Sequence, residues 1–455
     1  MNIVSLFAGC GGFDLGFKKA GFDIIWANEF DKTIHETYRY NHPDTILNTS
    51  DIRTLDISEI PDCDGIIGGP PCQSWSVGGK SLGLEDERGR LVYNYINIVS
   101  KKRPKFFIME NVPGMISPRH IKAFNDFISL FEKAGYIVKY KLINAADFCI
   151  PQERLRVFIV GIRNDINSEY FFPIPKSERS VTLFQAIGDL KTLPISYNTD
   201  NLVNRNNCIP NHDYYCGEFD KKFMARNRVR TWSELSFTIQ AQAKNAPLHP
   251  QAPKMIYLNS TQRIFAPGHE KKYRRLSIRE CARIQSFPDS FFFLYNTIID
   301  GYKMVGNAVP PRLAYHLALS IKDCLKKSES NNSTSLILLG YVKSEKDFEI
   351  IEREQVYYIR RGTRYGSLQF GQLSKPVKWL LLHRDKRREL FELEQSRVEK
   401  CDNETLEKYG FKPKGNEYWL FRIKKRLLNN SSLNTFVNEI KELHKFPQII
   451  HFYFH

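Results

Sequence analysis

The sequence predicts an α/β fold in which helices cover both faces of a doubly wound, mainly parallel sheet. Over residues 1–163, short apolar runs alternate with helical patterns, and glycine or polar residues separate them. Strands that alternate with helices are typical of parallel sheets, which bind ligands at the carboxyl ends of their strands. At 455 residues, the chain is long enough for two or three domains that each bury a core.

The predicted strands of this sheet are five apolar runs: residues 2–7, 23–29, 63–69, 105–111 and 157–163. Apolar residues recur every three or four positions in the segment before Gly21 and in residues 120–135, so both segments are predicted helices. Gly21 favours a helix end because glycine readily adopts the left-handed conformation found there.

The pattern changes over residues 164–273, which are rich in Asn, Pro and Arg and are predicted to form a smaller lobe. Residues 274–285 and roughly 311–327 have helical patterns again. The segment 274–327 is therefore expected to rejoin the domain of residues 1–163.

The end of the chain is predicted to form an extra α+β domain. The polar run 326–335 is interpreted as a linker, and residues 336–455 mix strand and helix patterns. This tail carries 23 Lys or Arg against 16 Asp or Glu, with aromatic residues among them. An accessory nucleic-acid contact, a surface for protein contacts and a fused nuclease remain open, although Glu439-Ile440-Lys441 is a bare ExK motif.

The charge of the chain favours a polyanionic partner. The sequence contains 66 Lys or Arg against 50 Asp or Glu, a net charge of +16. Residues 201–275 contain thirteen Lys or Arg against five Asp or Glu, a local net of +8 that favours nucleic acid over an ordinary solvated surface.

Other classes of protein are disfavoured by composition. The sequence has no apolar run of 18 residues, so no membrane span is predicted. Nine scattered cysteines are typical of a reducing cytoplasm. Cys208, His212 and Cys216 are the one arrangement worth testing for zinc, but no CxxC accompanies them, so no metal is expected.

A glycine turn follows the first predicted strand. Gly9 and Gly11 lie before a helix, and the acidic Glu29 ends the next strand twenty residues after Gly9. Glycines let a backbone approach a ligand, and a carboxylate at a second strand end can accept both hydroxyls of a ribose. The pattern indicates a nucleoside-containing cofactor, with a purely structural turn as the alternative.

A thiol, a carboxyl and two guanidiniums are expected at the same sheet edge. Cys72 follows Pro70-Pro71 at the end of a strand, and Glu110 ends another strand. Arg154 and Arg156 lead into the last strand of this region. A nucleophilic cysteine needs a positive potential that favours its thiolate, which an inert structural cysteine lacks.

These segments resemble the ordered motifs of the cytosine-5 DNA methyltransferases. The matching segments are FAGCGG, Glu29, Asp51, PPCQSWS, ENV, QERLR, RRLSIRECARIQSFPDSF (274–291) and GYKMVGNAVPP (301–311). The resemblance covers residues 1–325. It implies an S-adenosylmethionine-dependent methyltransferase fold with a DNA target-recognition lobe over 164–273. Within that lobe, residues 226–255 resemble the HaeIII-type modification enzymes, which act on GGCC.

The resemblance implies a covalent reaction without a metal. Cys72 adds to carbon 6 of cytosine, which activates carbon 5 for methylation. Glu110 holds ring nitrogen 3 and the amino group. Arg156 holds the ring carbonyl oxygen, and Arg154 adds positive potential nearby.

For the cofactor, the resemblance places S-adenosylmethionine over Phe7 and the Gly9–Gly11 turn. Glu29 takes the ribose, Asp51 takes the adenine amino group, and Pro71 and Asn307 lie nearby. Phe7 as a simple core aromatic remains the alternative.

The resemblance also implies double-stranded DNA as the partner, with the target base swung out of the duplex. Ser76 is an expected DNA contact, as is Lys244, although Arg stands in its place in the GGCC subgroup. Arg226, Arg228 and Arg230 alternate as in a strand, which would put three donors on one face. Phosphate contacts or a solvated face are the alternatives.

The implied role is that of a monomeric enzyme paired functionally with a restriction endonuclease. Two rival functions stay open at this point. One is a transfer RNA cytosine-5 methyltransferase, which has a similar architecture. The other is a non-catalytic DNA-binding homologue, which should have lost Cys72 or Glu110.

Overall fold

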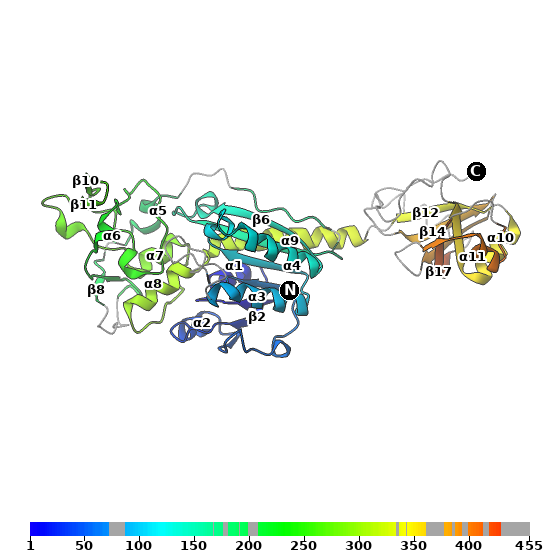
Figure 1. Cartoon of the computed structure of the whole chain (residues 1–455), viewed down its shortest axis with the longest axis horizontal. Helices are drawn as coiled ribbons and strands as arrows, with labels where there is room; N and C mark the ends of the chain where they lie inside the picture. The colour runs from blue at the N-terminus through cyan, green and yellow to red at the C-terminus, as the bar shows by residue number, and fades with distance from the viewer. Residues whose placement is uncertain are drawn as a thin grey trace. The chain divides into compact units, whose positions relative to one another are not determined.

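The computed structural model describes residues 1–71, 87–166, 168–175, 181–190, 192–198, 208–333, 336–342, 344–360, 377–384, 387–393, 399–412 and 418–428. The chain divides into two compact units, Met1–Ile166 with Tyr170–Asp323 and Asn167–Glu169 with Cys324–His455 (Figure 1). None of the helices in the described part is long and apolar enough to cross a membrane.

A seven-stranded sheet forms the centre of the first unit. Its strands are β1 (Asn2–Leu6), β2 (Asp23–Asn28), β3 (Ile46–Asn48), β4 (Gly65–Gly68), β5 (Phe106–Asn111), β6 (Tyr136–Asn144) and β7 (Leu155–Arg163). They lie in the order β3-β2-β1-β4-β5-β7-β6, and only β7 of these seven runs against its neighbours. The predicted α/β fold with a mainly parallel sheet is therefore confirmed.

The strand order reverses direction beside β1. The chain passes from β1 through β2 to β3 on one side and then crosses to β4 on the other side. In open α/β sheets, the crevice outside the carboxyl ends of the strands at such a point is the usual ligand site. The sequence predicts that the functional side chains lie at the carboxyl ends of the strands, and this crevice is at the same edge of the sheet.

Helices cover both faces of the sheet, as alternate residues of β5 show. The ring of Phe106 stacks on Phe17 of α1 (Gly12–Lys19), with centroids 6.4 Å apart, and Phe107 stacks on Phe131 of α4 (Ile121–Lys133) at 4.1 Å. Successive side chains of a strand point to opposite faces, so each ring enters a different layer. Burying one such ring contributes about 1.5–3 kcal/mol to folding. The helices of this region are α1 (Gly12–Lys19), α2 (His35–Asn41), α3 (Glu87–Lys102) and α4 (Ile121–Lys133).

Two features differ from the sequence prediction. The edge strand β6 was not among the predicted strands, because it mixes lysines with apolar residues and leaves Ile137 and Tyr140 exposed. The polar run 326–335 is not a linker throughout, since α9 (Pro311–Ser333) continues to Ser333. Extending an existing helix avoids the cost of a new nucleus, so polar residues such as Lys326 can prolong it.

The rest of the first unit has small elements around two apolar cores. They are α5 (Leu183–Ile187), β8 (Ile195–Tyr197), β9 (Asp213–Tyr215), α6 (Lys221–Met224), β10 (Ile256–Asn259), β11 (Gln262–Ile264), α7 (Ile278–Ile284) and α8 (Ile298–Asn307). One core joins Leu183 and Ile187 to Ile278 and Tyr302, so α7 and α8 pack with the segment 183–246. The predicted boundary between residues 273 and 274 stays a prediction. Helices α7 and α8, which follow this boundary, share a core with residues that precede it.

The second unit contains a six-stranded mixed sheet. Its elements are β12 (Leu336–Tyr341), α10 (Glu345–Glu354), β13 (Val356–Arg360), β14 (Val377–Arg384), β15 (Arg387–Leu393), β16 (Glu399–Cys401), α11 (Asn403–Lys408) and β17 (Tyr418–Leu428). Strands β12 and β14 are parallel, and the other pairs are antiparallel. Phe348, Leu380, Phe391 and Phe421 lie in its core. The mixture of sheet and helix agrees with the predicted α+β tail.

Candidate active site

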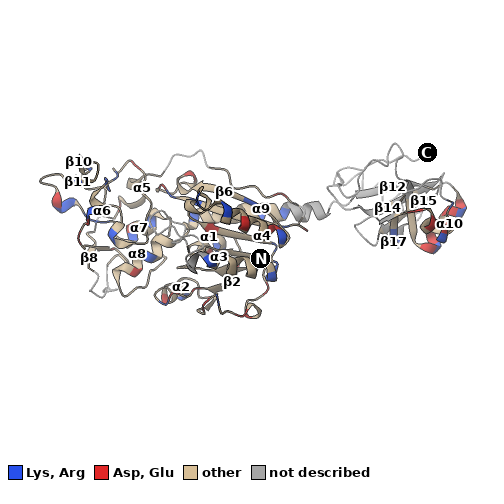
Figure 2. Ribbon diagram, viewed as in Figure 1, with Lys and Arg blue, Asp and Glu red and all other residues tan. Residues whose placement is uncertain are grey.

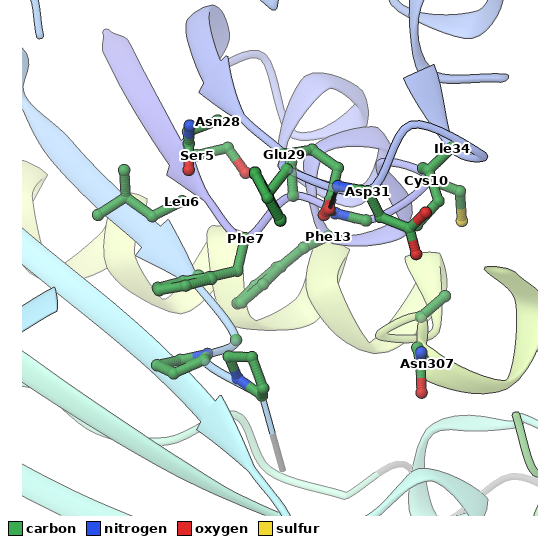
Figure 3. Close-up of a pocket in the computed structure, with 18 of the residues that line it drawn as sticks. Ser5, Leu6, Phe7, Cys10, Phe13, Asn28, Glu29, Asp31, Ile34 and Asn307 are labelled. Atoms are coloured by element: carbon green, nitrogen blue, oxygen red, sulfur yellow. Dashed lines mark hydrogen bonds between the residues drawn. The ribbon is translucent and has the colours of Figure 1, made fainter. Parts of the chain in front are cut away.

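A cavity of about 530 Å³ opens at the carboxyl edge of the first sheet. Residues after β1, β2, β3 and β4 and the end of β5 line it, and α8 closes the opposite side. Figure 3 shows Phe7 after β1, Phe13 of α1 (Gly12–Lys19), Glu29 after β2 and Asn307 of α8 around the same space. Its volume lies within the ~300–1,000 Å³ that is usual for small-molecule sites.

The turn after β1 requires glycine. Gly9 and Gly11 have φ of 56° and 86°, in the left-handed region. A Cβ on Gly11 would lie 2.1 Å from Nε2 of His42, whereas a Cβ on Gly9 would meet nothing within 4 Å. Phe7 also has a positive φ of 54°, which costs on the order of 1–3 kcal/mol in a residue other than glycine. The turn therefore lets the backbone approach whatever occupies the cavity.

Glu29 is fixed by backbone donors at the end of β2. Its Oε2 accepts a hydrogen bond from the amide of Gly9 at 2.9 Å, and its Oε1 accepts one from the amide of Asp31 at 2.7 Å. Burial raises the pKa of Glu29, and the two amides oppose that shift. Each oxygen keeps a further lone pair, so the carboxylate can accept hydroxyl groups from a ligand.

The remaining residues expected at the cofactor also line the cavity. Arg53 donates to both oxygens of Asp51, from Nε to Oδ1 at 3.1 Å and from Nη2 to Oδ2 at 2.6 Å, and this pair lowers the pKa of Asp51. Pro71 and Asn307 lie on the cavity wall. An apolar wall, a close-approach turn and a fixed carboxylate together fit a nucleoside-containing cofactor such as S-adenosylmethionine.

Another carboxylate that lines the cavity, Glu110, is held by a guanidinium. Nε of Arg156 lies 2.9 Å from Oε1 of Glu110, and both side chains are largely buried. Burial raises the pKa of Glu110, although the positive charges of Arg156 and Arg154 oppose this shift. A carboxyl with a raised pKa beside a cation is suited to hold and share a proton.

The turn that leads to Cys72 lies against this carboxyl. A Cβ on Gly69 would be 3.1 Å from Oε2 of Glu110, and Nδ2 of Asn111 donates to the carbonyl of Pro70 at 3.2 Å. The two strand ends are thus tied together. Cys72 itself, like Ser76, lies outside the described residues.

Arg154 does not share the position of Arg156. Its buried guanidinium donates to the backbone carbonyls of Ile239, Gly306 and Ala308 at 2.9–3.0 Å. These bonds join the start of β7 to the end of α8 and to Ile239 of the predicted smaller lobe, residues 164–273, which is called the second lobe from here on. The expected effect of Arg154 on the site is therefore electrostatic, through its charge near Glu110.

The three arginines predicted to alternate on a strand have different surroundings. Residues 226–230 form no regular strand, because only Val229 makes a bridge, to Leu248. Arg226 is exposed, whereas Arg228 is buried over the ring of Phe223 and donates to that residue's carbonyl.

Arg230 and Lys244 are both paired with acidic side chains. Arg230 binds Glu153 at 2.7 Å, and Lys244 lies 3.8 Å from Asp220. The expectation of one face with three equivalent donors is wrong, because no ladder imposes the two-residue period on residues 226–230.

Several residues that sequence reasoning missed lie in or beside the site. Lys303 of α8 contacts Asp31 at 2.8 Å, Thr33 at 2.7 Å and Asp300 at 3.3 Å, and Lys303 and Asp31 both line the cavity. Asp31 follows Glu29 by two residues and Lys303 precedes Asn307 by four. Proximity to predicted residues could therefore have indicated both.

The predicted weak zinc candidate has other partners. The ring nitrogens of His212 lie 2.9 Å from the Ser277 hydroxyl and 2.8 Å from the Thr192 carbonyl. Within the described ranges, no group of three His, Cys, Asp or Glu side chains is arranged to hold a metal ion.

The part of the chain that contains this site is similar to a known family of proteins. The model of the C-5 cytosine-specific DNA methylases matches residues 1–323. The chain is 52% identical over 332 residues to the Type II methyltransferase M.FnuDI of Fusobacterium nucleatum, covering 72% of this chain and 96% of that protein. It is 50% identical over 326 residues to M.MthTI of Methanothermobacter thermautotrophicus, covering 72% and 98%.

Solved structures show the same fold at lower identity. A putative DNA modification methyltransferase from an E. coli prophage superposes with a TM-score of 0.56 at 23% identity, covering 72% of this chain and 99% of that one. A Spodoptera frugiperda DNMT2 mutant gives 0.51 at 19% identity, covering 70% and 99%.

Proposed function

The chain belongs to the C-5 cytosine-specific DNA methylases, and we propose that its cavity edge methylates carbon 5 of a cytosine swung out of a short duplex site. The observation that carries this proposal is the place of Glu110. It lies on the cavity wall, pairs with Arg156, and contacts the turn that leads to Cys72.

S-Adenosylmethionine, on which this family depends, supplies an electrophilic methyl group when bound. Glu29 would hold the ribose, because its two oxygens are already fixed by backbone amides. Asp51 would bind the adenine amino group at the next strand end. Phe7, Gly9, Pro71 and Asn307 would form the walls around the rest of the molecule, and Gly11 would shape the turn from behind, where it packs on His42.

The chain's own residues would then activate the cytosine. The Cys72 thiolate forms a bond to carbon 6, and the ring electrons move toward nitrogen 3, where the Glu110 carboxyl shares its proton. Arg156 stabilises charge on the ring carbonyl oxygen. After methyl transfer, the proton on carbon 5 leaves and the bond to Cys72 breaks, which restores the thiolate and the aromatic ring.

The second lobe is proposed to choose the site, with the inner cytosine of GGCC as the target. Arg226 is exposed and suited to a bidentate contact with guanine. Arg228 would have to leave the ring of Phe223 and the carbonyl that it binds in order to read a base. Arg226→Ala should cost about 1–3 kcal/mol at one base position if this residue reads guanine. If Arg226→Ala instead weakens binding equally for all DNA sequences, Arg226 contacts phosphates and not a base.

The biological role that follows is protection of the site from a cognate restriction endonuclease by a monomeric enzyme. The Type II methyltransferase names of the relatives support this role. The transfer RNA alternative is not favoured, because the matching family is one of DNA methylases. Methyl transfer to duplex DNA and to transfer RNA, measured side by side, tests this choice.

The decisive experiment separates chemistry from binding. Cys72→Ser should abolish methyl transfer and leave DNA binding intact, because a serine hydroxyl is a much weaker nucleophile at neutral pH. Duplex DNA with 5-fluorocytosine at the target should form a covalent adduct with the unmodified enzyme, because fluorine cannot leave as a cation. More than a few per cent of normal turnover in Cys72→Ser, or the absence of an adduct band on a denaturing gel, would contradict the covalent route.

A further inference from the structure

In the hairpin of β10 and β11, strand β10 leaves three apolar side chains exposed to solvent. Ile256, Tyr257 and Leu258 are 41%, 61% and 50% exposed, and these two strands form a sheet of their own (Figure 1). An isolated two-stranded hairpin is marginally stable in water, and an exposed apolar cluster usually marks an interaction site. The folding of the first unit does not explain why these side chains are apolar.

One face of the hairpin presents an aromatic ring and a cation as a pair. Tyr257 lies opposite Arg263 in the antiparallel register, and Cζ of Arg263 lies 5.1 Å from the centre of the tyrosine ring. Ile256 lies opposite Ile264, one residue away, and therefore on the other face. The ring orients the guanidinium while leaving its N–H groups able to donate.

The base of the hairpin is tied to the segment that carries Arg226 and Arg228. The amide of Met255 donates to Oδ1 of Asn227 at 3.1 Å, and Nδ2 of Asn227 donates to the carbonyl of Val229 at 2.7 Å. Val229 and Met255 share a core with Tyr273, which stacks on Phe265 at 4.2 Å. The hairpin therefore has a fixed place beside the proposed DNA-reading residues.

The charge around the hairpin is positive. The sequence contains no Asp or Glu from residue 235 to residue 269, a stretch that includes Lys244, Lys254 and Arg263. Lys271 and Lys272 follow in the turn η6 (Glu270–Lys272), and both are exposed. Figure 2 shows blue ribbon at this turn, next to the red of an acidic residue, and blue ribbon at α6. Three carboxylates lie among these cations, because Glu270 begins the same turn and Lys254 and Lys244 lie 3.5 Å and 3.8 Å from Glu234 and Asp220. The cations outnumber the carboxylates, so the surface keeps a net positive charge that is complementary to phosphate.

The tip of the hairpin carries neutral hydrogen-bond donors. Residues 259–262 are Asn, Ser, Thr and Gln. Oδ1 of Asn259 accepts from the amide and the hydroxyl of Thr261, which leaves the amide nitrogen of Asn259 to donate outward. Such side chains, together with Arg and Tyr, make most protein contacts to DNA phosphates and sugars, which fix register without reading sequence.

We propose that the β10–β11 hairpin binds the phosphate backbone of the duplex beside the target site, outside the bases that the second lobe reads. This inference rests on the proposed function, since it takes duplex DNA as the substrate. Strand β10 has four residues and is about 13 Å long at ~3.3 Å per residue. It can therefore follow about four base pairs at ~3.4 Å each.

The test compares two duplexes that carry the same central site, one of about one helical turn (~10 base pairs) and one of about three turns (~30 base pairs). The full chain with Tyr257→Ala and Arg263→Ala should bind the long duplex about tenfold more weakly, which is about 1.4 kcal/mol. It should bind the short duplex like the unmodified protein. Its salt slope on the long duplex should fall by about one for a lost phosphate contact, and discrimination against altered sites should not change.

Two controls make the result specific. Tyr140→Ala with Lys141→Ala removes a comparably exposed tyrosine and a cation from β6, in the same unit, and should change neither affinity. Arg263→Lys keeps the positive charge and should retain most of the affinity for the long duplex. Because Tyr257 and Arg263 lie outside the apolar core, the thermal unfolding of the double variant should match that of the unmodified protein.

Three outcomes would overturn the hairpin proposal. If the double variant and the unmodified protein bind the long duplex equally, the hairpin does not bind DNA. If the double variant loses the same affinity on both duplexes, the hairpin contacts the recognition bases and not the flanking phosphates. A change in self-association without a change in DNA binding would assign the hairpin to a second copy of the chain. The proposed function is judged separately, by whether the unmodified protein methylates the site at all.

Discussion

The two ends of the cavity each carry a carboxylate, the half-buried Glu29 and the buried Glu110, and these differ in what holds them. Glu29 follows β2 and accepts hydrogen bonds from two backbone amides, whereas Glu110 ends β5 and pairs with Arg156. Burial raises the pKa of both. Two groups of the same chemical type, at equivalent places in the sheet, are therefore prepared for different tasks.

The partners of the two carboxylates differ in charge. Neutral backbone amides hold Glu29, whereas a charged guanidinium holds Glu110. Backbone amides hold the Glu29 oxygens in place without adding a charge, which suits a group that only accepts hydrogen bonds from a ligand. A guanidinium beside Glu110 makes the proton position sensitive to any further charge that develops nearby. We therefore expect the Glu29 end to determine affinity and the Glu110 end to determine rate.

The largest expected effect is at the catalytic end. Glu110→Gln keeps the size of the side chain but cannot give up or share a carboxyl proton, so turnover should fall about 10²–10⁴-fold. The affinity for S-adenosylhomocysteine should change little. Single-turnover methylation and calorimetric titration measure the two quantities, and a loss mainly in cofactor affinity would break the proposed division.

The pH dependence of the rate is the matching control for Glu110. Burial raises its pKa, so the folded protein keeps the carboxyl proton at a pH where an ordinary glutamate has lost it. The contribution of this proton to the rate is present below the raised pKa and is lost as the pH rises through it. The alkaline decline of the rate should be absent in Glu110→Gln, and an unchanged decline would point to another group.

The second effect is at the cofactor end. Glu29→Gln replaces an oxygen with an NH₂ group that faces a backbone amide, so one acceptor is lost and two donors meet. Hydrogen bonds to charged groups are each worth about 1.5–3 kcal/mol, which predicts a rise of about 10- to 150-fold in KM for S-adenosylmethionine. At saturating cofactor, kcat should stay within a few-fold of normal. A fall in kcat comparable to that of Glu110→Gln would mean that the two ends are not separable.

A smaller effect should follow from removing the cation of α8. Lys303→Met breaks the ion pairs with Asp31 and Asp300, which are partly exposed. Such pairs are worth about 0.2–1 kcal/mol, so KM for the cofactor should rise at most about fivefold. Lys303→Arg should restore most of the affinity, and the rise in KM of Lys303→Met should shrink at high salt.

The smallest effect on catalysis should come from the second unit. A fragment of residues 1–330 retains the region that matches the methylase family, so it should methylate the same site at a similar rate. If the tail contacts DNA, the fragment should bind more weakly and with a shallower salt dependence. Identical affinities and slopes for fragment and full chain would leave protein contacts as the role of the tail.

The strand ends of the sheet could be predicted because apolar runs and the polar residues after them are local features. Glu29 and Glu110 were placed correctly at the carboxyl edge for this reason. Arg154 and Arg156 belong to one short motif, so the residue pattern alone did not distinguish them, and only the family resemblance gave them different roles. Arg156 lies within β7 and reaches Glu110, whereas Arg154 precedes the strand and turns to three carbonyls.

The contacts of the second lobe depend on residues distant in sequence, and this limits prediction there. Arg228 lies over the ring of Phe223, and that ring is held in a core with Leu248 and Tyr273, which are distant in sequence. Lys303 meets Asp31 across 272 positions of the chain, so its partner cannot be read from its neighbours. The pairing of Arg230 with Glu153 is equally non-local.

The tight packing of α8 against the second lobe limits how specificity can be transplanted. A Cβ on Gly306 would lie 2.3 Å from backbone atoms of Gln240 and Ala241, and Arg154 binds the carbonyl of Ile239 from the other side. A recognition segment grafted from another methylase must reproduce the backbone path of residues 239–241, whatever side chains it brings. Chimeric enzymes that exchange sequence of the second lobe away from residues 239–241 should stay active. Exchanges that shift residues 239–241 by one position should lose both cofactor binding and target choice.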